Sequence, residues 1–206
     1  MDILSRLEAF EFDVLKEVGN IGSGNAATAL STLLNKPIDM AVPEVSLLPF
    51  EQVAEQVGGA EEVVVAIFLR VEGDAPGNMF YIMDDETARR LLDHLLPTTE
   101  EQSLSYTELE LSTLCEISNI LAGSYLSSLA DFTKLTLQPS VPVIAYDMAG
   151  AILNYGLMQY GEMGDSALLI ETAFLEGYQA LNGQFFFIPD PLSFEKIFHA
   201  LGVGFG

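Results

Sequence analysis

The sequence predicts an α+β fold: one internally duplicated domain with a pseudo-two-fold axis, a central and largely antiparallel sheet, and two long motif-bearing helices. Three observations lead to this prediction. One polar pattern occurs twice at a constant spacing of 99 residues, and an apolar block recurs at a spacing of 106. Each half also contains the same order of expected elements: helix, strand, helix, strand, strand, helix.

The repeated pattern consists of an acid or Ser, a Glu four residues later, an Asn three residues after that, and a Pro. The first copy is Asp13, Glu17, Asn20 and Pro43, and the second is Ser112, Glu116, Asn119 and Pro142. A constant offset over a whole pattern indicates an internal duplication. Core packing alone does not repeat polar residues such as Glu and Asn, so the pattern points to a function.

The second repeated block is GNMFYIMD at 77–84, which recurs as GQFFFIPD at 183–190. Its spacing of 106 against 99 gives the second half seven additional residues, and we expect them within 145–163. We expect one domain over residues 1–206, with half repeats at 1–97 and 105–206. Each half alone would expose the apolar faces of its strands.

In the first half, residues 4–35 are expected to form a long helix, because apolar or small residues recur at helical spacing and Pro37 ends the pattern. Asp84 is expected to cap a later helix that ends near Leu96. Between these helices we expect an extended segment, a short helix, and two strands joined by a Gly- and Pro-containing turn, at 38–48, 50–57, 62–71 and 77–83.

The second half follows a polar linker, LPTTEEQSLSY, and repeats the same order. Pro191 fits the first turn of its last helix. The expected elements are a helix at 107–130, an extended segment at 135–146, a helix at 147–160, strands at 165–173 and 179–188, and a helix at 191–201. Adjacent strands in each half are expected to form antiparallel hairpins.

Composition excludes several classes of function. Thirty acidic and eight basic residues give a net charge of −22, which repels nucleic acid and anionic lipid surfaces. The longest uncharged apolar run, 63–69, is too short to span a membrane, and no signal peptide is visible. The single cysteine, Cys115, fits a reducing cytoplasm. No His, Cys and carboxylate cluster has metal-ligand spacing, so we expect no metal site in this chain.

On a helix, Asp13, Glu17, Asn20 and Gly24 fall within one stripe about 60° wide, as do Ser112, Glu116, Asn119 and Gly123. We expect both stripes to face solvent. Glycine inside a helix costs about 1 kcal/mol relative to Ala; the repeat of Gly24 as Gly123 favours access for a partner, whereas Gly22 suggests close packing. Two alternatives remain: a solvated face retained by chance, and hydrogen bonds to neighbouring backbone.

A carboxylate and a carboxamide one turn apart, without Ser, His, Cys or metal ligands, make a poor nucleophilic or acid–base site. The amide can instead hold a water for in-line attack on a phosphoryl group, as a Gln does in GTPases. The Glu would repel that phosphoryl group and is better suited to anchor a cation of a partner. The phosphate, the metal and the cation must then come from a second protein.

The doubled motif, with GNIGSGNAATAL and SNILAGSYLSSLAD around its asparagines, closely resembles the CheC family of bacterial chemotaxis phosphatases over essentially the whole chain. The resemblance implies hydrolysis of the aspartyl phosphate of the response regulator CheY. Glu17 and Glu116 would pair with a lysine of CheY, while Asn20 and Asn119 orient the attacking water. Mg²⁺ would be bound by CheY, and no cofactor by this chain.

Both motifs are intact, which favours the CheC type over the CheX type, with one active helix per chain, and over the FliY type, with an added domain. The resemblance also implies a second partner, the receptor deamidase CheD, and we expect a monomer. We expect CheD to dock at the additional residues, with Asp147 and Met148 at the start of their helix. Two other functions remain open: a non-catalytic adaptor that docks CheY and regulates CheD, and a purely structural module.

Overall fold

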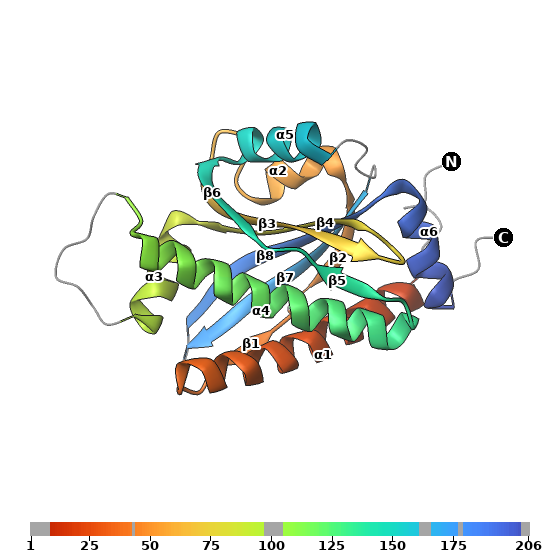
Figure 1. Ribbon diagram of the computed structural model, residues 1–206, viewed down its shortest axis with the longest axis horizontal. Coiled ribbons are helices and arrows are strands. Elements are labelled where there is room, and N and C mark those ends of the chain that lie inside the picture. The colour runs from red at the N-terminus through yellow and green to blue at the C-terminus, as the bar shows by residue number, and fades with distance from the viewer. Residues whose placement is uncertain (1–8, 43, 97–104, 161–165, 177–178, 203–206) are drawn as a thin grey trace.

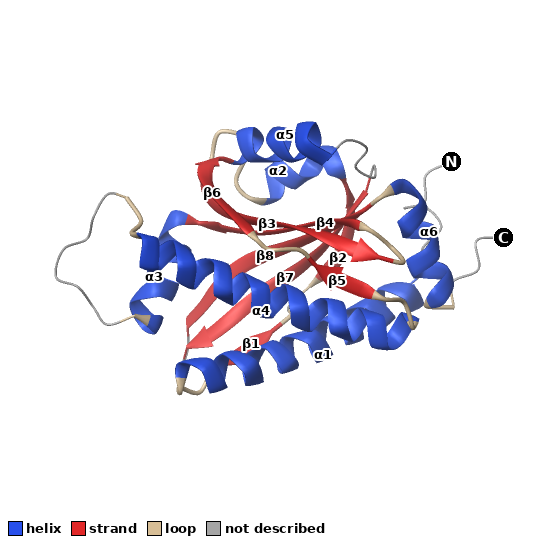
Figure 2. Ribbon diagram, viewed as in Figure 1, coloured by secondary structure: helices blue, strands red, loops and turns tan. Residues whose placement is uncertain are grey.

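The computed structural model describes residues 9–42, 44–96, 105–160, 166–176 and 179–202. It has three layers, with the sheet in the middle (Figures 1 and 2). Helices α1 (Ala9–Leu34) and α4 (Glu108–Thr133) cover one face, and α2 (Val53–Gln56) and α5 (Ala149–Tyr160) cover the other. The predicted α+β class, with one long helix in each half, is confirmed.

The strands are β1 (Asp39–Ala41), β2 (Val45–Pro49), β3 (Val63–Gly73), β4 (Gly77–Asp84), β5 (Leu137–Pro139), β6 (Val143–Met148), β7 (Ser166–Glu176) and β8 (Gln179–Pro189). They form one antiparallel sheet in which β7, β8, β4 and β3 are central. β1 and β2 pair with β7, whereas β5 and β6 pair with β3. Each half therefore completes the sheet of the other half.

The pseudo-two-fold axis passes between β4 and β8. Phe80 lies opposite Phe186 in this antiparallel pair, and these two residues are also counterparts in the repeated block. Both side chains are fully buried in the core on the α2 and α5 side of the sheet. The recurring apolar block is therefore the centre of the sheet, where the two halves meet.

Two hydrophobic cores lie on opposite faces of the sheet, because successive side chains of a strand point to opposite faces. In β4, Met79 and Tyr81 pack toward α1 and α4, while Phe80 and Ile82 pack toward α2 and α5. A strand that is buried on both faces needs a continuous apolar run. This requirement explains why the blocks 77–84 and 183–190 lack the alternation of a half-exposed strand.

The long helix α4 has a clear start and end in the sequence. Thr107 is its N-cap and forms a capping box with Glu110: the Glu110 amide donates to the Thr107 hydroxyl at 3.3 Å, and the Thr107 amide donates to the Glu110 carboxylate at 2.6 Å. Lys134 ends the helix in a left-handed conformation, with φ of 60°. These contacts fix the ends of the helix that presents Glu116 and Asn119.

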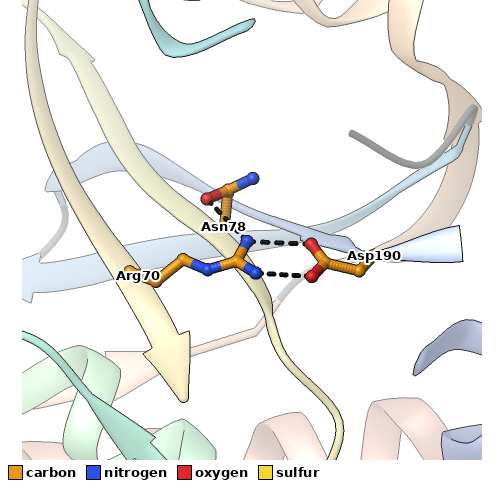
Figure 3. Close-up of polar contacts among 3 residues, drawn as sticks. All are labelled: Arg70, Asn78 and Asp190. Carbon is orange, nitrogen blue, oxygen red and sulfur yellow. Dashed lines mark hydrogen bonds and ion pairs between the residues drawn. The ribbon is translucent and has the colours of Figure 1, made fainter. Parts of the chain in front are cut away.

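Helices α3 (Asp85–Leu95) and α6 (Pro191–Ala200) follow two aspartates, Asp84 and Asp190, that are counterparts in the repeat. The contacts of these two aspartates differ. Asp84 caps α3 as predicted, since its carboxylate accepts from the Thr87 amide at 2.6 Å. Asp190 does not cap α6 with its side chain. It forms a two-point ion pair with Arg70, whose Nη1 donates to Asp190 at 2.8 Å and to Asn78 at 3.1 Å (Figure 3).

Several predicted boundaries were wrong. The expected helix at 147–160 begins only at Ala149, because Asp147 and Met148 continue β6 and pair with Val64 and Val63. The expected extended segments at 38–48 and 135–146 are each divided into two strands. The residues of the first expected helix that precede Ala9 lie outside the described part of the chain, as does Pro43.

The predicted position of the additional residues of the second half was also wrong. Phe80 pairs with Phe68, 12 residues earlier, whereas its counterpart Phe186 pairs with Leu169, 17 residues earlier. Five of the seven extra residues therefore lengthen the β7–β8 hairpin, and only two precede Leu169. The stretch 145–163 does not contain the main insertion, because hairpin length depends on strand register, which local sequence does not reveal.

Candidate functional site

The two repeated stripes lie at the surface. Asp13, Glu17, Asn20 and Gly24 on α1, and Ser112, Glu116 and Asn119 on α4, are exposed, and Gly123 is half-buried. The Glu and Asn side chains of both stripes make no hydrogen bond or ion pair with the described part of the chain. Hydrogen bonding to neighbouring backbone therefore does not explain the repeat. The four side chains are free to contact a partner.

The glycines of α1 divide into two kinds. A Cβ at Gly22 would lie 2.5 Å from the ring and 3.1 Å from the Cα of Tyr125 on α4, so close helix packing requires Gly22. A Cβ at Gly24 would meet nothing within 4 Å, and the same is true of Gly123. Intrachain packing does not require the two stripe glycines. Their absent side chains leave bare helix backbone one turn after Asn20 and Asn119.

A buried tyrosine packs beneath the two stripes, between α1 and α4. The Tyr125 ring lies between the helices and the sheet, 5.2 Å from the Phe185 ring, and its hydroxyl is 3.1 Å from the Thr172 hydroxyl. Burial is the main cause that raises the pKa of Tyr125, to about 12, so the phenol stays neutral. This buried tyrosine fixes the position of α4 against α1, and with it the spacing of the two stripes.

The surroundings of the two asparagines differ. Beside Asn20, a Cβ at Gly19 would lie 3.5 Å from Val42, which is 4% exposed. In the second half the counterparts are Ser118, which is buried, and Val141, which is 85% exposed. Val141 precedes the motif residue Pro142, which is half-buried between β5 and β6. The repeat alone did not reveal this asymmetry, since Val42 and Val141 are the same residue type.

The one cysteine lies next to the second stripe but does not change its chemistry. Cys115 is half-buried on α4, and burial raises the pKa of its thiol. A raised pKa keeps the thiol protonated and poorly nucleophilic. Among the described residues, no three His, Cys, Asp or Glu side chains gather in the manner of a metal site. The stripes thus present a carboxylate, an amide and bare backbone to a partner.

Asp147 and Met148 lie away from the stripes, where edge strand β6 leads into α5. Both side chains are exposed, and the Asp147 carboxylate accepts from the Met148 amide at 2.8 Å. On α5, Ile152 and Leu153 are buried against the sheet, whereas Tyr155 is 63% exposed. The side chains of 156–160 lie outside the described set. An acid and two apolar groups therefore share the accessible surface of this region.

Comparison with known proteins places these features in a family. The family model described as the CheC-like family matches residues 10–47 and 109–146, and each segment contains one stripe. The chain is 43% identical over 206 residues to the CheY-P phosphatase CheC of Bacillus subtilis, covering 98% of this chain and 99% of that protein. It is 28% identical over 137 residues to the flagellar motor switch phosphatase FliY of Bacillus subtilis, covering 66% of this chain and 35% of that protein.

Solved structures share the fold. FliY of Thermotoga maritima has a TM-score of 0.72 at 21% identity, covering 95% of this chain and 98% of that chain. The FliM middle domain of H. pylori has a TM-score of 0.67 at 8% identity, covering 94% of this chain and 99% of that chain. No helix in the described ranges combines the length and apolarity that are needed to cross a membrane.

Proposed function

The chain belongs to the CheC-like family, and on that premise we propose that it is a phosphatase that hydrolyses the aspartyl phosphate of the chemotaxis response regulator CheY. The name of its Bacillus subtilis relative supports the phosphatase class and the substrate. The observation that carries the proposal is the pair of exposed Glu and Asn stripes, which have no structural partner within the described chain.

Asn20 and Asn119 position the attacking water. Each carboxamide can accept a hydrogen bond from water and donate one to it. A water held in this way attacks the phosphorus in line, and the bond from phosphorus to the aspartyl oxygen breaks. The products are inorganic phosphate, which takes the proton of the water, and the free carboxylate of the regulator. The exposure of both amides supports this role.

Glu17 and Glu116 anchor the regulator. Each carboxylate precedes its Asn by three residues and lies on the same helix face. A lysine of CheY is the expected partner, because two such groups form a charge-assisted pair once the docked surfaces exclude water. The Mg²⁺ that offsets phosphoryl charge is supplied by CheY.

The test is the decay of phosphorylated CheY in excess Mg²⁺, with and without this protein. We expect the protein to accelerate decay at sub-stoichiometric amounts, since hydrolysis regenerates a free site. An adaptor without catalytic groups would bind CheY and leave the decay rate unchanged. Unchanged decay under conditions where a complex is detected would overturn the phosphatase assignment and leave the adaptor function.

A second function is supported by the surface around Asp147. We propose that Asp147 and Met148 contribute to docking of the receptor deamidase CheD. The exposed Asp147, Met148 and Tyr155 combine one charge with apolar surface, a composition suited to a protein contact. This surface is not a site of insertion, because most of the extra residues of the second half lie in the β7–β8 hairpin.

The docking proposal is tested by the affinity of CheD for an Asp147→Lys variant. Glu195→Lys is the matched control, since it makes the same charge change at an exposed position of α6. We expect the Asp147 variant to bind at least tenfold more weakly and the control to bind normally. Equal affinity of both variants and the wild type would remove this surface from the deamidase interface.

A further inference from the structure

The two stripes face away from each other. Helices α1 and α4 lie side by side, run in opposite directions (Figure 1), and contact each other through Gly22 and Tyr125. Gly22 is two residues from Asn20, a rotation of about 200° around the helix. Glu116 is nine residues from Tyr125, a net rotation of about 180°, and Asn119 is six residues from it, about 120° away, so the stripe is centred about 150° from Tyr125. Each stripe therefore lies on the side of its helix opposite the helix–helix contact.

The outer flanks of the helix pair overlie opposite edges of the sheet. α1 packs on β1 and β2, where a Cβ at Gly19 would lie 3.7 Å from Val45. α4 packs on β5 and β6. These strand pairs lie at the two ends of the sheet order. The stripe of α1 and the stripe of α4 therefore project from opposite sides of the molecule.

Helix geometry gives the separation of the two asparagines. From the Gly22–Tyr125 contact, Asn20 lies two residues back along α1 and Asn119 six residues back along antiparallel α4. At about 1.5 Å per residue these displacements add to about 12 Å along the helices. Axes about 8–10 Å apart, plus a backbone radius of about 2.3 Å on each side, give about 13–15 Å across the pair. The two Cα atoms are thus about 17–19 Å apart.

The size of a partner domain decides what this spacing allows. A compact domain of about 100 residues has a radius of gyration of about 13 Å, which corresponds to a sphere roughly 33 Å across. Two such spheres that approached from one side at a spacing of about 20 Å would overlap. On opposite flanks, each centre lies a further radius outward, so the centres are roughly 50 Å apart and the spheres do not touch.

We propose that two response-regulator domains dock at the same time, one on each flank of the α1–α4 pair, so that the saturated complex contains two regulators per chain. This inference rests on the proposed function and adds its stoichiometry. The two sites then act independently, and neither regulator blocks the other. The close packing of Gly22 against Tyr125 sets the spacing of the two sites but contributes no group to either.

The test is a titration of the protein with CheY that carries beryllofluoride and Mg²⁺, followed by calorimetry and by sedimentation for the mass of the complex. We expect two CheY molecules per wild-type chain. Glu17→Lys and Glu116→Lys are each expected to bind one, and the double variant none. Glu195→Lys, the same charge change on α6, should still bind two. Thermal unfolding monitored by circular dichroism checks that each variant is folded.

The outcomes separate this inference from the proposed function. A single CheY on the wild-type chain, with one CheY still bound by each single variant, means that the sites exclude each other and overturns the inference alone. Two CheY molecules on the double variant place the docking sites elsewhere and also overturn it. A wild-type chain that binds no CheY at any concentration overturns the proposed function and the inference with it.

Discussion

Gly24 and Gly123 occupy helix positions where the chain itself has no need of glycine. Open space surrounds the Cβ position of both, whereas Gly22 is pressed against Tyr125. The sequence separated these cases correctly, because Gly24 recurs in the second half and Gly22 does not.

The sequence also identified the stripe residues, since helical spacing and the duplication are visible without contacts. It did not reveal that Val141 is exposed and Val42 buried, because that difference depends on tertiary packing, in which Val42 lies against α1 beside Gly19.

Substitution of the two stripe glycines tests whether bare helix backbone at these positions is needed for a partner to dock. Gly24→Ala and Gly123→Ala should each raise the free energy of unfolding by about 0.5–1 kcal/mol, because Ala is the better helix former and no atom obstructs its methyl group. Both should slow hydrolysis, because the methyl group covers backbone that the regulator approaches. Urea denaturation and the CheY-phosphate decay assay measure the two effects.

Gly22→Ala serves as the contrasting variant. Its methyl group would press on the ring and backbone of Tyr125, so we expect a loss of about 1–3 kcal/mol in unfolding free energy. If the Gly24→Ala and Gly123→Ala variants are more stable but retain full activity, bare backbone at the stripes has no part in docking.

At the scale of elements, hydrophobic patterning predicted the order of helices and strands but not their limits. β6 extends through Asp147 and Met148 because pairing with β3 outweighs their local preference. The β7–β8 hairpin takes most of the insertion, which only strand register shows. One cluster also joins α3 and β6 through Tyr106, in the segment before α4, without any sequence signal. Asp85 at the start of α3 accepts from the Tyr106 hydroxyl at 2.7 Å and from Arg89 at 2.8 Å, and the Tyr106 ring lies 5.3 Å from that of Tyr146 on β6.

This cluster predicts a pH-dependent contribution to stability. Burial alone would raise the pKa of the Asp85 carboxyl, but the hydrogen bonds from Tyr106 and Arg89 together lower it. A carboxyl whose folded pKa is lowered stabilises the protein above its unfolded pKa of about 3.9, and this contribution is lost as pH falls toward the folded value. We expect Asp85→Asn to lower the unfolding free energy by about 1 kcal/mol at neutral pH.

The measurement is urea denaturation of wild type and variant from pH 7 to pH 3. The difference in unfolding free energy between wild type and the Asp85→Asn variant should be constant above about pH 5 and shrink below about pH 4. Glu86→Gln is the control, because its exposed pair with Arg90 is worth less than about 0.5 kcal/mol. A difference that does not depend on pH would mean that the Asp85 charge does not stabilise the fold.

In the whole molecule, strands of one half pair with strands of the other half. β2 of the first half pairs with β7 of the second, β6 pairs with β3, and the axis pair Phe80–Phe186 joins the two centres. The duplication predicted the pseudo-symmetry and the fold class. The expected antiparallel hairpins, β3–β4 and β7–β8, are confirmed. The sequence could not predict the pairings between the two halves, because residues 64 to 136 positions apart leave no periodic trace of their pairing.

Because the outer strands of each half complete the sheet of the other half, the structure predicts how the isolated halves behave. Fragments 1–97 and 105–206 should each fail to fold as monomers, since each lacks the outer strands that cover its central hairpin. Mixing them in equal amounts should restore one cooperative unfolding transition, with a midpoint that rises with concentration. Circular dichroism of each fragment and of the mixture tests this. A monomeric fragment with a concentration-independent transition would show that each half is a domain by itself.

One exposed asparagine in each half, Asn20 or Asn119, is proposed to position the hydrolytic water. The most direct measurement is the decay rate of phosphorylated CheY in excess Mg²⁺ with Asn20→Ala, Asn119→Ala and the double variant, beside Asn25→Ala, an exposed asparagine of α1 outside the stripe. Loss of the amide should slow each site by about 10²-fold. Each single variant then retains only the activity of its intact site, the double variant falls to about a hundredth of wild type or below, and Asn25→Ala is unchanged. A folded double variant that still accelerates decay at the wild-type rate would show that neither asparagine positions the water.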